Sequence, residues 1–194
     1  MKPAPVIIVS GPSGSGKSTL IHRALNESGL PLRLSVSATT RPPRSGEIDG
    51  VDYHFWTRER FLRELERGAF LEHAVVHGQH YYGTPRSEVD GFRERGIGVI
   101  LDIDVQGADQ VRPLFPDHLS VFVRVSSDEE YARRLRQRGT ETDESIARRM
   151  ATARKELARI GDYQHVVVND DLDIATAQLI DLLRRRFDAV SPGR

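Results

Sequence analysis

The chain has 194 residues, which is enough for one sizeable hydrophobic core but short for two independent domains. Its 28 basic residues balance 28 acidic ones and 38% of its residues are apolar, which argues against both disorder and a nucleic-acid partner. It has no cysteine and no apolar run that could cross a bilayer, so we expect a soluble, cytoplasmic protein without a membrane partner.

The first predicted strand, Val6 to Ser10, leads into the loop GPSGSGKS and then an apparent helix. The loop fits the pattern G-x-x-x-x-G-K-[ST], whose backbone N–H groups cradle the phosphates of a nucleoside triphosphate. A flexible Gly/Ser connector is the alternative, but the flanking strand and helix favour a phosphate loop. In such a loop the lysine reaches the β and γ phosphates and the hydroxyl ligates Mg²⁺, which here are the roles of Lys17 and Ser18. The predicted triphosphate-binding residues are Gly11, Pro12, Ser13, Gly14, Ser15, Gly16, Lys17, Ser18 and Thr19.

Residues 37–89 interrupt the alternation of strands and helices and are rich in Gly, Pro, Tyr and His. We predict that they form a small mixed α/β insert. Arg41 and Arg44 lie there in a proline-stiffened loop, with Tyr53 following. Arginine forks match phosphate oxygens, so this loop is a candidate second anion site, although loop arginines in so arginine-rich a chain also serve as solvated surface groups.

Later strands are expected at Leu34–Ala38, Val99–Asp104, Val121–Val125 and His165–Asn169. Continuous apolar strands separated by helices are typical of a parallel sheet covered on both faces. One of these strands ends in Asp102 and Asp104, which are two residues apart and therefore on the same face. Either carboxylate could serve the magnesium side of the triphosphate site, or could only cap a turn.

The last third of the chain is predicted to be helical except for its final strand. Residues 128–160 form a strongly charged helix, turn, helix pattern, which indicates a lid. Towards the C-terminus an apolar stripe at helical spacing is predicted to face the core. Its members are Ile174, Ala177, Ile180, Leu183 and Phe187.

These elements predict an α/β fold of the P-loop NTPase type, with a parallel sheet and helices on both faces. The core comprises residues 1–36, 90–127 and 161–194, the insert 37–89 and the lid 128–160. A GTPase switch is disfavoured because none of the three lysines follows an asparagine, so the guanine-reading motif N-K-x-D is absent. A kinase would use the arginine loop to hold its acceptor.

Six segments occur in the order, and at nearly the spacings, found in guanylate kinases, and they cover the chain from Val6 to about Leu183. They are SVSATTRPPRSGEIDGVDYHF, GAFLEHA, YYGT, ILDIDVQGA, RGTETDESIARRM and VVVNDDLD. The chain therefore resembles guanylate kinases, enzymes of purine nucleotide metabolism and GMP recycling. The resemblance implies transfer of the γ-phosphate of ATP to GMP or dGMP, giving ADP and GDP, with Mg²⁺ as cofactor and small molecules as partners. A homo-oligomer is compatible with the sequence.

The resemblance also implies roles for particular residues. The GMP phosphate would be held by Arg41, Arg44, Tyr53 and Tyr82, and the guanine would be read by Ser37, Glu72, Thr84 and Asp104. Asp102 would lie near the phosphates and Mg²⁺, among the GMP-binding residues. In the lid, Arg138 and Arg149 would approach ATP as catalytic residues together with Lys17 and Arg41, with Arg134 a weaker candidate, and Asn169 would lie near the adenine.

One departure from the family pattern concerns HGQHYYGT, which is one residue longer than usual. Tyr81 and Tyr82 therefore compete for the phosphate-binding role, and the Y-G-T register favours Tyr82. Three other functions remain as alternatives: a kinase acting on a ribose phosphate, a phosphopeptide-binding module without catalysis, and a plain ATPase. The first would not need Glu72, and the second tends to lose the phosphate loop, which is intact here.

Overall fold

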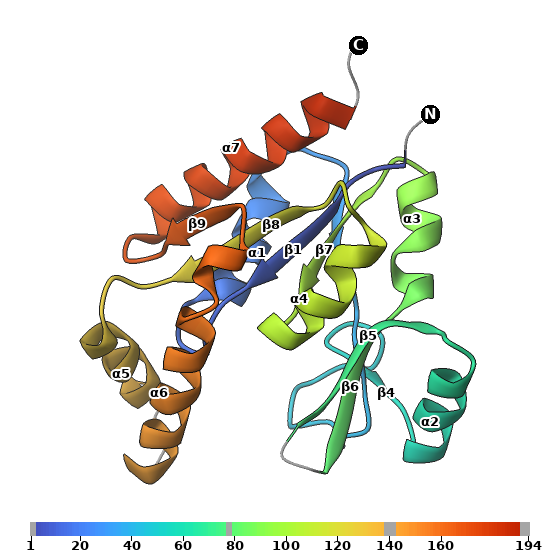
Figure 1. Cartoon of the computed structure of the whole chain (residues 1–194), viewed down its shortest axis with the longest axis horizontal. Helices are drawn as coiled ribbons and strands as arrows, with labels where there is room; N and C mark the ends of the chain where they lie inside the picture. Colours follow the sequence, from blue (N-terminus) through green and yellow to red (C-terminus); the bar gives the residue numbers. More distant parts are fainter. Residues whose placement is uncertain (1–2, 77–78, 138–142, 191–194) are drawn as a thin grey trace.

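The structure, a computed structural model, describes residues 3–76, 79–137 and 143–190 (Figure 1). Its larger sheet is made of β1 (Val6–Ser10), β2 (Leu32–Leu34), β7 (Gly98–Asp102), β8 (Leu119–Arg124) and β9 (His165–Val168). The strand order is β2-β7-β1-β8-β9, and every neighbouring pair is parallel. In a parallel sheet the carboxyl ends of the strands meet at one edge, where loops can converge on a ligand.

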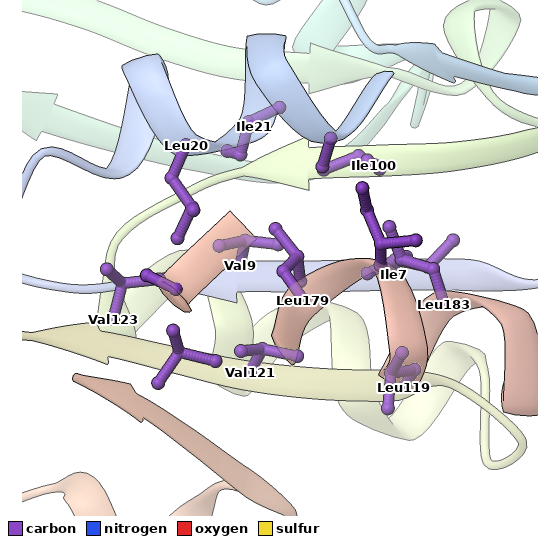
Figure 2. Packing of buried hydrophobic residues seen from close by; sticks show 14 residues of the cluster. Ile7, Val9, Leu20, Ile21, Ile100, Leu119, Val121, Val123, Leu179 and Leu183 are labelled. Carbon is purple, nitrogen blue, oxygen red and sulfur yellow. The ribbon is translucent and has the colours of Figure 1, made fainter. Parts of the chain in front are cut away.

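Helices cover both faces of this sheet, as predicted, because successive side chains of a strand point to opposite faces. On β1, Ile7 and Val9 join a buried cluster with α1 (Lys17–Glu27) and α7 (Leu172–Val190), as Figure 2 shows. Val6 and Ile8 join a second cluster with α3 (Asp90–Glu94) and α4 (Val105–Val111). The α/β fold with a doubly covered parallel sheet is therefore confirmed.

The smaller sheet comes wholly from the region predicted to be an insert. Its strands are β3 (Ala38–Thr39), β4 (His54–Phe55), β5 (Phe70–Val76) and β6 (His80–Pro85), in the order β4-β3-β6-β5. It is mixed, since β3 is parallel to β4 and antiparallel to β6. Helix α2 (Arg58–Glu66) packs on it through Phe61, which stacks on Phe70 with 4.4 Å between ring centroids. The sheet thus has a small apolar core of its own.

Two further helices, α5 (Asp128–Gln137) and α6 (Asp143–Leu157), follow β8 in the region predicted to be a lid. In Figure 1 this pair and the smaller sheet extend from the same side of the larger sheet, to the lower left and lower right. The described residues also form three short 3₁₀ helices, η1 (Arg86–Glu88), η2 (Arg112–Leu114) and η3 (Ile160–Asp162). Among the helices that the structure describes, none is both long and apolar enough to span a membrane.

The prediction of a strand at Leu34–Ala38 is wrong. β2 ends at Leu34 and β3 begins at Ala38, so the residues between them carry the chain from the larger sheet to the smaller one. The N–H of Ser35 still donates to the carbonyl of Ile100 at 2.9 Å, but the pairing stops there. A β-rich composition does not reveal where a chain leaves one sheet for another.

The stripe predicted for the last helix is partly wrong. Ile174 is 69% exposed and Ala177 is also exposed, whereas Leu179 and Leu183 are fully buried. At 100° per residue, Ile174 lies about 140° around the helix from Leu179, so the two cannot share the face that meets the sheet. Ile180 and Leu183 do face the core as predicted.

Candidate functional site

The phosphate loop joins β1 to α1 and depends on glycine at two points. Gly16 has φ 77° immediately before the helix, a left-handed conformation that side chains other than glycine rarely adopt. Gly11 also has a positive φ, and a Cβ there would overlap the carbonyl oxygen of Val123 on the neighbouring strand β8. The path of the loop therefore requires glycine at both positions, and the loop ends at the first residues of α1, Lys17 to Thr19.

Lys17, Ser18 and Asp102 come together at the end of the loop. The Lys17 ammonium contacts Oδ1 of Asp102, and the Ser18 hydroxyl donates to Oδ2 at 3.2 Å. Asp102 is the last residue of β7, which pairs with β1. The pairing of these two strands therefore brings Asp102 close to the loop that follows β1. Burial lowers the pKa of Lys17 to about 8, while the charges of Glu156 and Asp104 oppose that change. The lysine thus stays largely protonated at neutral pH.

Asp104 does not extend β7. It caps α4, where its Oδ1 accepts the N–H of Gly107 at 2.8 Å. Of the two candidate aspartates, Asp102 therefore meets the phosphate loop, and Asp104 serves as a helix cap with its second oxygen available. The turn cap expected as one alternative is thus made by Asp104, while the magnesium-side role of Asp102 stays a prediction.

Arg41 lies in a cradle of aromatic and acidic groups on the smaller sheet. Its Nε donates to the hydroxyl of Tyr82 at 3.1 Å, and its guanidinium carbon lies 5.5 Å from the centre of the Tyr53 ring. The rings of Tyr53 and Tyr82 meet edge to face at 5.9 Å. The structure thus brings together three of the four residues predicted at the acceptor phosphate, while the side chain of Arg44 is exposed.

Glu47 completes this cradle, and sequence reasoning missed it. Its carboxylate accepts two hydrogen bonds from Arg41, at 2.8 and 2.9 Å, and one from the N–H of Arg44 at 2.6 Å. These bonds hold the pKa of Glu47 below its usual value. The sequence held one signal for this role. Glu47 follows Arg44 by three residues, at the end of a loop that must fold back on itself, which could have indicated that its carboxylate meets the loop arginines.

Tyr81 and Tyr82 are neighbours on β6, so their side chains point to opposite faces of the sheet. Tyr82 faces Arg41. Tyr81 packs on Phe61 in the small core, with 5.4 Å between ring centroids, and contacts Arg58. The geometry favours Tyr82 at the acceptor phosphate, in line with the Y-G-T register.

Glu72 is a buried acid with a single side-chain hydrogen-bond partner among the described residues. It is 7% exposed, and Oε1 accepts the Thr84 hydroxyl at 2.7 Å across the β5–β6 pair. Burial, together with the charge of Asp104, raises the pKa of Glu72 to about 7 against the opposing effect of Thr84. Ser37 lies in the segment that enters β3, and its carbonyl accepts the N–H of His54.

Helix α6 contacts the phosphate loop directly, and helix α5 is linked to it through Asn169. Arg149 on α6 donates to the Ser13 hydroxyl at 2.9 Å, and Arg134 on α5 donates to the carbonyl of Asn169 at 2.8 Å. The Asn169 amide in turn donates to the carbonyl of Ser15 at 2.7 Å. Arg138, predicted to be catalytic, lies outside the described residues.

Glu156 on α6 is a second acid that sequence reasoning missed. Burial and the charge of Asp104 raise its pKa to about 7, while the charge of Lys17 opposes this rise. It follows Arg149 by seven residues, which is two helical turns, so both side chains lie on the face of α6 that is turned to the phosphate loop. That spacing was the signal that could have identified it.

Comparisons with known proteins identify the family of this chain. The model of the guanylate kinase family matches residues 3–186. The guanylate kinase of Rubrobacter xylanophilus is 48% identical over 186 residues, spanning 95% of this chain and 96% of its own. That of Alkalilimnicola ehrlichii is 50% identical, spanning 91% of this chain and 86% of its own.

A solved structure points the same way. The crystal structure of guanylate kinase from Anaplasma phagocytophilum superimposes with a TM-score of 0.76 at 32% identity, covering 95% of this chain and 87% of that one. Sequence and fold are thus shared over nearly the whole length with relatives of one family, including both sheets and the phosphate loop. This chain belongs to the guanylate kinase family.

Proposed function

We propose that this chain transfers the γ-phosphate of ATP to GMP, or to dGMP, giving ADP and GDP. The observation that carries the proposal is the buried carboxylate of Glu72, on the same sheet as the Arg41 cradle. Guanine presents N1–H and an amine as donors, which a carboxylate accepts. Adenine lacks these donors at that edge and would leave a buried acid unpaired, at a cost of about 1–3 kcal/mol for each lost partner.

The donor side of the reaction belongs to the phosphate loop. The backbone N–H groups of the loop and the Lys17 ammonium are proposed to hold the β and γ phosphates of ATP. Arg149, already in contact with Ser13, and Arg138 are proposed to approach the transferring group from the lid. Charge spread over the phosphoryl oxygens is stabilised best by donors that are fixed in advance, which the contacts of Lys17 with Asp102 provide.

Ser18 and Asp102 fit a magnesium ion. Mg²⁺ prefers hard oxygen ligands, and here a hydroxyl and a carboxylate oxygen lie 3.2 Å apart beside the phosphate loop. These two residues are proposed to hold the ion, Asp102 directly or through water. When bound, Mg²⁺ neutralises charge on the β and γ phosphates.

The acceptor side belongs to the smaller sheet. Arg41, Arg44, Tyr53 and Tyr82 are proposed to hold the phosphate of GMP, and Ser37, Glu72, Thr84 and Asp104 its base. Holding both nucleotides converts a bimolecular reaction into an intramolecular one, and no covalent intermediate is needed. The proposed reaction needs neither a nucleic-acid nor a membrane partner, and we propose that the enzyme acts in the cytoplasm.

The test is ADP release from ATP and Mg²⁺ with GMP, AMP, a ribose phosphate or no acceptor. We expect rapid turnover with GMP alone, and a loss of about 100-fold or more in kcat for Lys17→Ala, which removes a fixed charge at the transferring group. Lys155→Ala, on the exposed side of α6, is the matched control and should behave as wild type. Equal turnover with AMP would overturn the guanine assignment, and turnover without acceptor would favour a plain ATPase.

A further inference from the structure

The edge of the smaller sheet packs on helix α4 through Leu71 of β5, and one polar side chain of the helix hydrogen-bonds to the strand. β5 is an edge strand, so the backbone groups of alternate residues point away from β6 and need other partners. The amide of Gln110 satisfies both groups of one such residue. Its Oε1 accepts the N–H of His73 at 3.1 Å, and its Nε2 donates to the carbonyl of His73 at 3.0 Å. The Gln110 amide thus makes the two hydrogen bonds that a neighbouring strand would otherwise make to His73, the residue that follows Glu72.

One turn earlier on α4, Gly107 touches both acids that are proposed to read the guanine. Its N–H donates to Asp104, and the space where its Cβ would stand is filled by Glu72. A Cβ built at Gly107 would lie 2.9 Å from Oε2 of Glu72, closer than real Cβ contacts. Since Oε1 is held by Thr84, the carboxylate has its present position only because residue 107 lacks a side chain.

Gly107 and Gln110 are three residues apart and therefore share one face of α4. From these contacts we propose that both are positioning residues for guanine recognition. Gln110 fixes β5 against α4, and Gly107 leaves the room that lets the Glu72 carboxylate stand beside Asp104. Glu72 lies on β5 and Asp104 caps α4, so the spacing of the two acids depends on how β5 is held against α4. The inference rests on the proposed function, because it assigns the base to these acids.

The first test is Gly107→Ala. The new methyl group meets Oε2 of Glu72 at 2.9 Å and, less closely, the Cβ of Ile103 at 3.3 Å, so the carboxylate has to move aside while Ile103 gives way by only a few tenths of an ångström. We expect KM for GMP to rise about tenfold or more, with kcat at saturating GMP and KM for ATP within about twofold of wild type. Alanine is also the better helix former, so Tm should not fall.

The matched control is Gly91→Ala in α3, where a Cβ would meet only the end of Arg95 at 3.5 Å, an ordinary contact. This variant should leave both KM values unchanged. An unchanged KM for GMP in Gly107→Ala would overturn the steric part of the proposal. A rise in both KM values would also overturn it, because it would indicate a general disturbance of the fold.

The second test is Gln110→Met, which keeps the length of the side chain but removes both hydrogen bonds to His73. We expect KM for GMP to rise several-fold and KM for ATP to stay constant. Gln178→Met, at an exposed position on α7, is the control and should change neither. If Gln110→Met had the wild-type KM for GMP, the Gln110–His73 contact would have no role in positioning Glu72.

A double-mutant cycle separates positioning from any other effect of Gly107. With Glu72→Ala as background there is no carboxylate to displace, so adding Gly107→Ala should raise KM for GMP no further. Additive effects would overturn the proposal. If the wild-type chain does not phosphorylate GMP, the proposed function itself fails. If the wild type does, and the cycle is additive, only the positioning role fails.

Discussion

Glu72 combines burial with a titration range close to neutral pH. Its pKa of about 7 has burial as the main cause, with the charge of Asp104 acting in the same direction. A carboxyl group accepts both guanine donors only when ionised, because the protonated form turns one oxygen into a donor. The burial that underlies the proposed guanine selectivity of Glu72 therefore also makes that selectivity dependent on pH.

We expect KM for GMP to rise as pH falls from about 8 to about 6, by about tenfold, since a group with a pKa near 7 is about one-tenth ionised one unit below it. Glu72→Gln does not titrate, so its KM should be higher at pH 8 but should change less. The GMP phosphate, whose second pKa is near 6, titrates equally in both proteins and cancels in the comparison. Parallel pH profiles for the two proteins would show that Glu72 is not the titrating group.

At the scale of elements, the phosphate loop is braced from β9 and α5. Asn169 is 3% exposed, and its amide donates to the carbonyl of Ser15 inside the loop. Its nitrogen also fills the space above Gly16, so the bare α-carbon of that glycine accommodates the brace. Arg134 holds the backbone of Asn169 in turn. The family resemblance predicts that this residue lies near the adenine of ATP, and its contacts add a structural role in the loop.

Asn169→Ala should therefore act on stability and on the donor nucleotide together. It leaves the buried carbonyl of Ser15 without this partner, which costs about 1–3 kcal/mol and lowers Tm by several degrees in a chain of this length. KM for ATP should rise while KM for GMP changes little. Asn26→Ala, at an exposed position on α1, is the control. If Asn169→Ala melted at the wild-type temperature, the brace would be refuted, whatever the kinetics.

At the scale of the whole molecule, the sequence predicts best what is local. The phosphate loop, its lysine and the strand ending at Asp102 lie in short continuous segments whose residue types are dictated by the backbone or by phosphate. The spacing of Glu156 from Arg149 puts both on one face of α6, but only the fold shows that this face reaches the environment of Lys17, near the other end of the sequence.

Other misses concern register and long-range pairing. The face of α7 was misjudged at Ile174 because a mildly apolar helix offers two stripes, and only packing on the sheet selects one. The two bonds from Gln110 to His73 join an α-helix of the core to an edge strand of the smaller sheet. No spacing along the sequence encodes that contact.

The two sheets are also joined at the point where the chain crosses between them, by Glu88 of η1. This carboxylate accepts a hydrogen bond from Nη2 of Arg33 on β2 at 2.7 Å, and it lies 2.9 Å from Nε2 of His54 on β4. It also accepts a hydrogen bond, at 3.3 Å, from the N–H of Val36 between the two sheets. Its side chain is only 14% exposed. One acid thus ties the core, the smaller sheet and the segment between them.

Glu88→Gln should loosen this junction. Burial alone would raise the pKa of Glu88, but His54 and Arg33 outweigh it and lower the pKa below 4.5. The ionised acid therefore contributes stability above about pH 4.5, and this contribution is lost as the pH falls through the lowered value. In urea unfolding at pH 7, the variant should be less stable by about 1–3 kcal/mol. The difference from wild type should narrow below about pH 4.5, whereas the exposed Glu66→Gln should match wild type throughout. A difference that stayed constant with pH would mean that shape, and not the charge of Glu88, holds the two sheets together.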